Sequence, residues 1–565
     1  MIPFYTLRQR KDLVWIIILS VIVLIPNLFL AIYGSDFHGA SILKTATYIT
    51  VSFILFFIPS LFLKVRTFFL IQGIFVLLAP VEMAHIYMNK MTVTLAFLQS
   101  IYLTNIQETT ELLSAIEIPV LLFFTIYIFY FYITIAKIEN SYFIQSKKIK
   151  VYALGIICIL FFSGYSFCVV KAYKTTPSKE DAVKIGTEKF LLKFYKIYPY
   201  DLILKSYQVY AIQKEVRKNY TQLESFAFGA KKNIPVKEKE VYLLVIGETA
   251  RYNSFSLNGY GRKTNPLLEN MPNIISYSDF HSEANITQSS LPFILTRATP
   301  KNYELSNKEK SFVDAFQEAG FHTYWIANQS SGNYFIRRIA TDCNKEYFAT
   351  VDFDTANNFD ENLWPSLDEI LSQDEDKIFI VLHTLGSHFR YNFRYPSTFE
   401  KYQPSLKGAF DYGIISVKNK ELLINTYDNS ILYTDYFLAN TIHKLDSMNC
   451  ISTAIYVSDH GENLFDTEEN IVLHAGSSYT KYDFHVPFIF WSSEKYNKTY
   501  PYKIENILSN KDKKLSSNTI FYSILDIADI TFPGFEISRS IASDSLKEDS
   551  IRYILTTNMK VKQGY

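Results

Sequence analysis

Three strand-like apolar runs in the C-terminal half are followed by side chains that bind metals or do acid–base chemistry. Glu248 comes directly after VYLLVIG (241–247), and Asp459 and His460 follow the run TAIYVS. His388 comes shortly after a third run, in KIFIVLHTLGSH. Because ligands of such sheets bind beyond the carboxyl ends of the strands, we expect these side chains to lie at one edge of a sheet.

Each of these side chains has an ordinary explanation when it is taken alone. A single Glu or His at a strand end is more often a helix cap or a satisfied core residue than a ligand. Several carboxylate and imidazole groups at consecutive strand ends are harder to explain without a metal ion. Carboxylates mixed with imidazole, without a thiolate, suit Zn2+ or Mn2+. The residues by themselves leave the choice between these two ions open.

The elements that must position these groups are short β-branched or aromatic runs separated by helix-like segments. Runs that are apolar on both faces and alternate with helices are typical of a sheet covered on both sides. We therefore predict an α/β domain for the C-terminal half. Its predicted strands are 241–247, 323–327, 377–385, 453–459 and 485–491.

The composition of the chain excludes several classes of protein. The 565 residues are 48% hydrophobic and 20% charged, which is too apolar for a disordered chain. The net charge of +1 gives no reason to expect a nucleic acid as partner. The cysteines at 158, 168, 343 and 450 form no CxxC pair, which excludes a four-cysteine zinc module. Only Cys343 and Cys450 are left as a candidate disulfide in the soluble part.

Five apolar stretches near the N-terminus are long enough to cross a membrane as helices. The first apolar run is longer than that of a signal peptide, and no small-residue cleavage site follows it, so we expect it to stay attached. The predicted spans lie near 13–33, 46–64, 67–87, 117–136 and 150–170.

Basic residues in the short flanks predict which ends of these spans face the cytoplasm. They are Arg8, Arg10, Lys11, Lys64, Arg66, Lys137, Lys147, Lys148 and Lys150. An odd number of spans then places the chain after about residue 171 on the opposite face, the periplasm of a Gram-negative cell. Residues 171–235 alternate charged and apolar side chains at a helix-like spacing, which predicts helices along the membrane interface. We expect a transmembrane domain with five helices at 1–170, an interfacial helical linker at 171–235 and a catalytic domain at 236–565.

Two longer motifs carry a resemblance to a known family. Gly247 to Pro266 reads GETARYNSFSLNGYGRKTNP, and Val457 to Asn463 reads VSDHGEN. The chain resembles the phosphoethanolamine transferases of the alkaline phosphatase/sulfatase superfamily, membrane enzymes that decorate lipid A and related glycans. The resemblance covers nearly the whole chain. It implies a five-helix transmembrane bundle in a bacterial inner membrane and a sulfatase-like α/β domain in the periplasm.

The resemblance also implies a reactive centre. It places the nucleophile at Thr287, in ANITQSSLP at the start of a helix. It assigns Glu248, Thr287, Asp459 and His460 to one tight Zn2+ site and leaves a second ion open. Coordination to zinc would activate the threonine hydroxyl, which is a poor nucleophile at neutral pH. The helix N-terminus would add donors for the phosphoryl oxygens.

Further residues match positions that face the substrate in this family. His388, in GSHFRYNFRYP, and His474, in VLHAG, match histidines that face the phosphoryl group or a second metal ion. The resemblance implies catalytic and substrate-binding roles for both. Asn328, in WIANQSSGN, matches a substrate-binding asparagine, although Asn333 stands where the family has a lysine.

The connector between the third and fourth predicted spans carries another family pattern. Thr104 and Glu108 match residues implicated in holding the ethanolamine head group, with Ser100 in place of the family's asparagine. They lie one helical turn apart on one face. An amphipathic helix solvated at the membrane surface would explain the same spacing, and that alternative stays open.

Taken together, the resemblance implies transfer of phosphoethanolamine from phosphatidylethanolamine to lipid A or another surface glycan, through a covalent intermediate on Thr287. The partners would be this donor, the glycan acceptor and membrane lipids, without nucleic acid. One alternative is a glycerophosphotransferase of the lipoteichoic acid synthase type, against which the string FSLNGYGR argues. Another is a catalytically silent membrane sensor. A sulfatase-type hydrolase is disfavoured because Thr287 is not the cysteine or serine from which formylglycine is made.

Overall fold

The structure is a computed structural model. It describes residues 7–34, 37, 41–89, 91–95, 97–98, 101, 118–144, 146–174, 179–223, 225–329, 334–348, 358–407, 416–476 and 478–565. The chain forms two compact units, one that ends at Ala211 and one that continues from Ile212 to the C-terminus.

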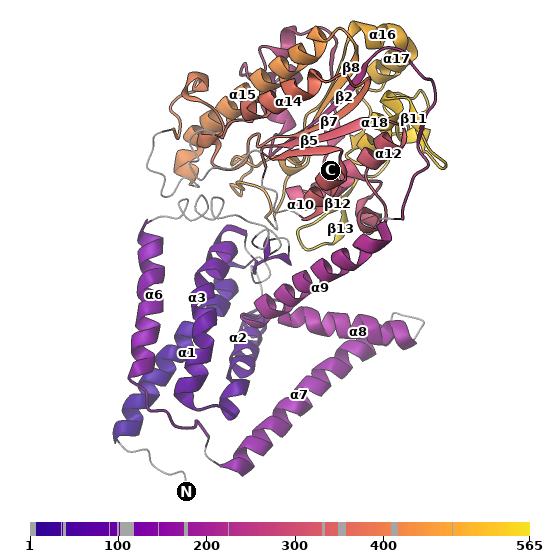
Figure 1. The fold of residues 1–565 in the computed structure, drawn as a ribbon. Helices are drawn as coiled ribbons and strands as arrows, with labels where there is room; N and C mark the ends of the chain where they lie inside the picture. The colour runs from indigo at the N-terminus through magenta and orange to yellow at the C-terminus, as the bar shows by residue number, and fades with distance from the viewer. Residues whose placement is uncertain are drawn as a thin grey trace. The chain divides into compact units, whose positions relative to one another are not determined.

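Apolar helices make up most of the N-terminal unit (Figure 1). They are α1 (Leu7–Tyr33), α2 (Ile42–Phe57) with the 3-10 turn η1 (Ile58–Leu61), α3 (Val65–Asn89), α6 (Ile118–Ala136) and α7 (Lys147–Tyr173). Among the described residues, four stretches are long and apolar enough to cross a membrane. A shorter apolar stretch, Leu121–Ala136, lies at the fourth predicted span. Each of the five predicted spans therefore falls on an apolar helix.

Helices α1, α2, α3 and α6 pack around buried aromatic and aliphatic side chains, such as Leu19, Phe56, Phe68 and Phe131. Helix α7 packs instead against α8 (Lys179–Phe194), and most of its side chains are exposed. A long apolar helix with an exposed surface is suited to a lipid environment. Helices α8 and α9 (Tyr200–Leu223) lie where interfacial helices are predicted.

A seven-stranded sheet forms the centre of the C-terminal unit (Figure 1). In spatial order its strands are β3 (Ile274–Ser276), β9 (Phe488–Ser492), β8 (Ile451–Ser458), β2 (Glu240–Gly247), β7 (Lys377–His383), β5 (His322–Ala327) and β6 (Lys345–Phe348). Strands β8, β2, β7, β5 and β6 are parallel, whereas β9 is antiparallel to both of its neighbours. All five predicted strands are present in this sheet.

Helices cover both faces of the sheet because successive residues of a strand point to opposite sides. In β2, the even-numbered residues from Tyr242 to Ile246 lie in one core and the odd-numbered residues from Val241 to Val245 in the other. The first core is closed by α10 (Thr287–Leu295), α12 (Phe312–Glu318), α13 (Tyr334–Asp342), α16 (Glu494–Thr499), α17 (Pro501–Ser509) and α18 (Thr519–Ile527). The second core is closed by α14 (Trp364–Leu371) and α15 (Lys420–Ser447). The predicted α/β class is confirmed.

Short elements complete the C-terminal unit. They are α11 (Leu305–Lys308) and three strand pairs: β1 (Lys231–Lys232) with β11 (Ile530–Thr531), β4 (Phe280–His281) with β10 (Leu515–Ser516), and β12 (Tyr553–Leu555) with β13 (Val561–Gln563). Strand β4 also lies next to the segment that precedes β9, where His281 forms an isolated antiparallel bridge with His485.

The two cysteines of the candidate disulfide are free thiols. Cys343 packs in the first core and Cys450 in the second. Because the sheet separates these cores, the two thiols cannot meet, and the disulfide is not formed.

The hydrogen-bond register aligns the carboxyl ends of the three central strands. Strands β2 and β8 end opposite each other at Gly247 and Ser458. Strand β7 ends at His383, opposite Ile246 of β2. The segments that follow these strands therefore begin side by side at one edge of the sheet.

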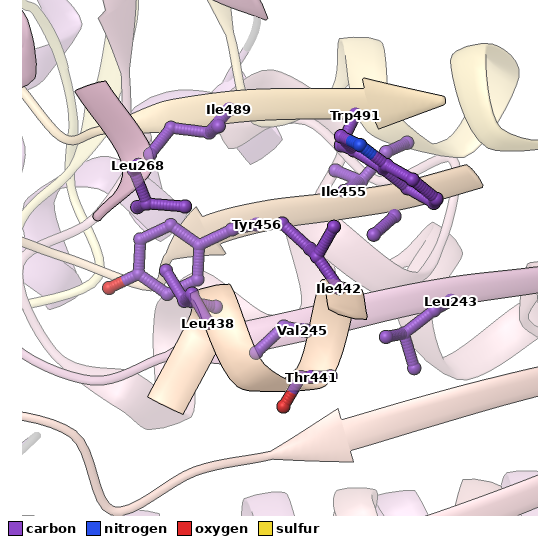
Figure 2. A pocket seen from close by; sticks show the side chains of 11 residues that line it. Leu243, Val245, Leu268, Leu438, Thr441, Ile442, Ile455, Tyr456, Ile489 and Trp491 are labelled. Carbon is purple, nitrogen blue, oxygen red and sulfur yellow. The ribbon is translucent and has the colours of Figure 1, made fainter. Parts of the chain in front are cut away.

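A small pocket lies inside the second core, between the sheet and α15 (Figure 2). Its lining is apolar and includes Val245, Tyr456 and Ile489 from the strands and Leu438 and Ile442 from the helix. Its volume of about 10 Å³ is at the lower limit for one water molecule, and apolar walls offer water no partners. The pocket is therefore a packing gap rather than a ligand site.

Candidate active site and metal centre

Glu248 is buried at the point where the chain leaves β2. The next residue, Thr249, has a φ of 58°, a left-handed conformation that surrounding contacts must hold. Its N–H donates to Asp459 Oδ1 (3.1 Å), its hydroxyl donates to Glu248 Oε1 (2.7 Å), and its carbonyl accepts from the Tyr427 hydroxyl (2.8 Å). Gly386, in the loop after β7, comes so close that a Cβ atom there would lie 2.8 Å from the Glu248 carbonyl oxygen. These contacts fix the Glu248 carboxylate in one orientation.

Asp459 and His460 leave β8 at the same edge and are fully buried. Asp459 Oδ1 accepts the N–H groups of Thr249 and His460, the latter at 2.7 Å. Its other oxygen, Oδ2, is buried without a hydrogen-bond partner in the described part of the chain. His460 Nδ1 donates to the Gly461 carbonyl (2.9 Å), so Nε2 is the nitrogen that faces the carboxylates.

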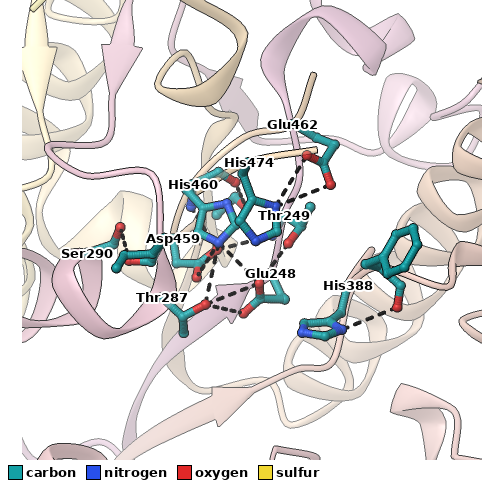
Figure 3. Close-up of polar contacts among 12 residues, drawn as sticks. Glu248, Thr249, Thr287, Ser290, His388, Asp459, His460, Glu462 and His474 are labelled. Atoms are coloured by element: carbon teal, nitrogen blue, oxygen red, sulfur yellow. Dashed lines mark hydrogen bonds and ion pairs between the residues drawn. The ribbon is translucent and has the colours of Figure 1, made fainter. Parts of the chain in front are cut away.

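Thr287 is the first residue of α10, as predicted, and its side chain points at Glu248 and His460 (Figure 3). Its hydroxyl donates to the Glu248 carboxylate, with oxygen–oxygen distances of 3.1 and 3.3 Å, and lies 3.4 Å from His460 Nε2. Thr287 is partly exposed, whereas Glu248, Asp459 and His460 are buried. A substrate can therefore reach this hydroxyl, and the first N–H groups of α10 favour negative charge beside it.

The four side chains are spaced as the ligands of one ion would be. His460 Nε2 lies 3.3 Å from Glu248 Oε1 and 3.5 Å from Asp459 Oδ2. Tetrahedral bonds of about 2.1 Å place neighbouring ligand atoms about 3.4 Å apart, which matches these distances and those of the Thr287 hydroxyl. Asp459 Oδ2, which accepts no hydrogen bond from the described residues, is also available to a cation. The donor set therefore fits a divalent metal ion such as Zn2+.

Electrostatics in the cluster favour a positive charge among the carboxylates. Burial, and then the charge of Glu248, raises the pKa of Asp459 to about 8. Burial opposes the charged form of His460, but the Asp459 and Glu248 carboxylates outweigh it and raise its pKa to about 10. Burial likewise opposes ionisation of Glu248, yet the hydrogen bond to His460 and its charge lower the pKa of that carboxyl. A proton on His460 or a bound metal ion supplies the positive charge.

His474 reaches the cluster from the loop after β8. Its ring centroid lies 4.1 Å from that of His460, and its Nδ1 donates to the buried Glu462 carboxylate at 3.2 and 3.3 Å. The Tyr391 hydroxyl donates to the same carboxylate (2.6 Å). Burial, and then the charge of His460, lowers the pKa of His474, which favours its neutral ring. Sequence reasoning missed Glu462 as the residue that orients His474, although it stands in the quoted VSDHGEN motif.

His388 lies apart from the four-residue cluster, on the other side of Glu248 (Figure 3). Its Nδ1 donates to the Phe389 carbonyl (3.3 Å). The ring is partly exposed and comes from the loop after β7. The structure thus brings His474 to the cluster and leaves His388 at its margin.

Asn328 is buried at the end of β5 and does not reach the cluster. Its side chain donates to Asp360 Oδ1 (2.9 Å), and Asp360 also accepts N–H groups from the loop after β7. The next residue, Gln329, is the amide that reaches Glu248, donating to Oε2 (3.3 Å) and to the Thr384 carbonyl (3.1 Å). Sequence reasoning missed Gln329, although it directly follows Asn328 in the quoted motif WIANQSSGN. Thr104 and Glu108, with Ser100 and Asn333, lie outside the described residues.

Comparison with known proteins gives matches over the C-terminal half. The family model described as Sulfatase matches residues 240–530. The chain is 29% identical over 321 residues to phosphoethanolamine transferase EptC of Escherichia coli K12, covering 55% of this chain and 54% of that protein. It is 31% identical over 304 residues to phosphoethanolamine transferase EptA of the same strain, covering 52% and 54%. The chain thus spans about half the length of the curated relatives it matches.

Solved structures extend the comparison to the fold. The C-terminal periplasmic domain of EcEptC from E. coli, crystallised in complex with Zn, matches with a TM-score of 0.52 and 28% identity, covering 57% of this chain and 91% of that one. The integral membrane protein lipooligosaccharide phosphoethanolamine transferase A from Neisseria meningitidis matches with a TM-score of 0.72 and 22% identity, covering 94% and 98%. The second match confirms the predicted architecture of apolar helices followed by a sulfatase-like domain.

Proposed function

Because the chain belongs to the sulfatase family, we propose that it is a membrane phosphotransferase that moves phosphoethanolamine from phosphatidylethanolamine to lipid A or another surface glycan. The observation that carries this proposal is a threonine hydroxyl within 3.4 Å of two metal-binding side chains at the carboxyl edge of the sheet. The similarity to proteins named phosphoethanolamine transferases supports the choice of the transferred group.

A Zn2+ ion fits the reactive centre, where Glu248, Thr287, Asp459 and His460 would hold it. The similarity to a domain solved in complex with Zn supports this choice of ion. When bound, the ion would lower the pKa of the threonine hydroxyl and offset negative charge that develops on the phosphoryl oxygens.

Two in-line displacements at phosphorus account for the transfer. In the first, Thr287 Oγ1 bonds to the donor phosphorus, the bond from phosphorus to the glycerol oxygen breaks, and diacylglycerol leaves. In the second, an acceptor oxygen bonds to phosphorus and the bond to Thr287 breaks. In the first step the neutral His474, oriented by Glu462, would take the proton of the Thr287 hydroxyl and return it to the leaving glycerol oxygen. In the second step it would pass a proton from the acceptor to Thr287 Oγ1.

The remaining candidate residues would hold the donor. We assign His388 to the phosphoryl group, which it would approach from the loop after β7. Asn328 would act through Asp360, by fixing that loop. Glu108 and Thr104 would hold the ethanolammonium head, for which a carboxylate is the matching charge.

The activity is tested with the full-length protein in vesicles that contain phosphatidylethanolamine with a fluorescent acyl chain. We expect release of fluorescent diacylglycerol and, with lipid A added, a product heavier by one phosphoethanolamine group in mass spectra. Release from phosphatidylglycerol vesicles alone would instead identify a glycerophosphotransferase. No release from either donor would identify a silent sensor.

The orientation in the membrane gives a prediction of its own. We expect a bacterial inner-membrane protein whose residues after about 171 lie in the periplasm, because the short basic flanks retain the other side in the cytoplasm. A reporter that is active only outside the cytoplasm should therefore work when fused after Lys214 and fail when fused after Lys148. A cytoplasmic reporter at the same two positions is the control and should give the opposite pattern. Activity of the first reporter at Lys148 alone would overturn the proposed topology. The reporters do not test the domain bounds at 170 and 235, which stay a prediction.

Glu462→Gln is expected to lower turnover about 10- to 100-fold without loss of the metal. The amide keeps the size of the side chain but weakens the contact that orients His474, and Glu462 is not among the proposed ligands. Diacylglycerol release and zinc content measured on the same sample check this expectation. Tyr391→Phe is the matched control, because it removes one donor to Glu462 and leaves the carboxylate. Loss of zinc in step with activity would show that Glu462 supports the metal rather than His474.

A further inference from the structure

A second group of metal-binding side chains lies outside the reactive centre. Asp279, His281 and His485 each offer one ligand atom, and these three atoms lie within 4.8 Å of one another. The group shares no residue with the four ligands of the reactive centre. We propose that it forms a separate site for a divalent transition-metal ion, with Zn2+ as the ion that suits two imidazoles and a carboxylate.

Backbone pairing places the two histidines next to each other. The segment at β4 runs antiparallel to the segment before β9, where the Ser282 N–H donates to the Phe484 carbonyl (2.8 Å). His281 and His485 face each other in this bridge, with ring centroids 4.8 Å apart. The backbone therefore holds the two imidazole rings side by side.

The ring of His485 is held in a defined orientation. Its Nε2 donates to the Ser278 carbonyl (3.1 Å), and the ring stacks on Tyr252 with centroids 4.0 Å apart and planes 9° apart. Histidines that bind metals usually donate their second ring nitrogen to such an acceptor, which fixes the tautomer. With Nε2 donating, Nδ1 is the ring nitrogen that keeps a lone pair for an ion.

The contact between His281 and Asp279 has the spacing of two ligands. His281 Nε2 lies 3.4 Å from Asp279 Oδ1, which is longer than a good N–H···O hydrogen bond. It equals the separation of about 3.4 Å expected for two atoms bound to one tetrahedral ion. Arg552 Nη1 lies 2.8 Å from the same oxygen and would orient the carboxylate from outside the site. The Asp279 side chain is 39% exposed and His281 only 9%, so an ion can enter from the carboxylate side.

The charge around this group predicts a weaker site than the reactive centre. One carboxylate faces the ion here, whereas Glu248 and Asp459 both do so in the reactive centre. The guanidinium of Arg552 adds repulsion at short range. When a chelator is added at increasing concentration, this ion should therefore be removed before the ion of the reactive centre.

The ligands belong to segments that continue into the reactive centre. The chain after His281 leads to Thr287, and Tyr252, stacked on His485, lies in the loop after Glu248. An ion bound here would hold these segments together, so its role is structural. The proposal does not rest on the transfer reaction.

The test uses the full-length protein in detergent after metal removal with EDTA, in an Asp459→Asn background that disables the reactive centre. Added Zn2+ should still bind at one ion per chain and raise the thermal unfolding temperature by several degrees. Co2+ in place of Zn2+ should give visible absorption bands of a histidine-bound ion. His485→Gln added to this background should abolish the bound ion, the stabilisation and the bands.

Two further variants guard against misfolding as the cause. Asp279→Asn changes a half-exposed side chain and should lower the affinity for Zn2+ at least about 10-fold. Before metal is added, the unfolding temperature of this variant should equal that of its parent. His322→Ala, which removes an exposed histidine at the start of β5, is the matched control and should bind Zn2+ as its parent does. Failure of the Asp459→Asn protein to bind Zn2+, or equal binding after His485→Gln, would overturn the proposal.

Discussion

Thr287→Ala is expected to lower diacylglycerol release at least about 1,000-fold while binding of phosphatidylethanolamine is retained. The hydroxyl of Thr287 is the group that would form the bond to phosphorus, and it is the partly exposed member of the four-residue cluster. Its removal leaves the donor site intact and takes away the nucleophile. Release of fluorescent diacylglycerol and retention of labelled donor by the protein measure the two effects separately.

The same residue should carry a covalent adduct in the wild-type protein. With donor alone, diacylglycerol release should stop at an amount limited by the enzyme, because the second step lacks its acceptor and only slow attack by water clears the intermediate. The tryptic peptide that contains Thr287 should then be heavier by one phosphoethanolamine group. Thr287→Ser should keep part of the activity, since the hydroxyl survives.

Neighbouring hydroxyls provide the matched controls. Ser290 donates to the carbonyls of Ala284 (3.1 Å) and Ile286 (2.9 Å), so its hydroxyl is committed to the backbone. Ser289 is buried in the first turn of α10, two residues after Thr287. Ser289→Ala should therefore keep the adduct on Thr287. An adduct on Ser289 or Ser290 in the Thr287→Ala protein would refute the nucleophile assignment.

The central strands could be predicted because they are buried on both faces. The run 241–247 became β2, whose residues are all buried, and such continuous apolar runs are typical of parallel sheets covered by helices. The short edge strands β3 and β6 were missed because each is at most four residues long and only partly buried. The run 485–491 begins too early, since Pro487 cannot donate to the ladder and β9 starts after it. Its antiparallel direction depends on tertiary pairing that no local pattern contains.

The residues of the candidate site likewise divide into those that strand ends predict and those that they do not. Glu248, Asp459 and His460 follow strand ends, so the register of parallel strands was enough to bring them together. Thr287 starts a helix and was reached through the family resemblance alone. Gln329 follows Asn328, which donates to Asp360, and its contact with Glu248 depends on how these segments pack. Side chains that loops position could therefore not be predicted from the ends of the strands.

The metal-free Asp459→Asn protein is expected to be folded and at least as stable as the metal-free wild type, although it has lost the zinc of the reactive centre and nearly all transfer. Asparagine keeps Oδ1, which accepts the N–H groups of Thr249 and His460. The atom it replaces, Oδ2, is buried without a hydrogen-bond partner in the described part of the chain and lies 3.5 Å from His460 Nε2. A buried carboxylate oxygen that accepts no hydrogen bond costs about 1–3 kcal/mol, a cost that a neutral amide reduces.

Zinc should reverse this order of stability. Added Zn2+ should stabilise the wild type by about 2.7 kcal/mol at 100 times the dissociation constant, whereas the reactive centre of Asp459→Asn lacks a ligand and contributes nothing. Zinc content should fall by one ion per chain, and transfer by at least about 1,000-fold, as expected when a ligand is lost from an ion that activates the nucleophile. Asp368→Asn is the matched control, because it makes the same chemical change at a half-exposed residue paired with Lys444. If Asp459→Asn keeps the zinc content of the wild type, or if its metal-free form is much less stable, Asp459 is a structural residue and the proposed ligand set is wrong.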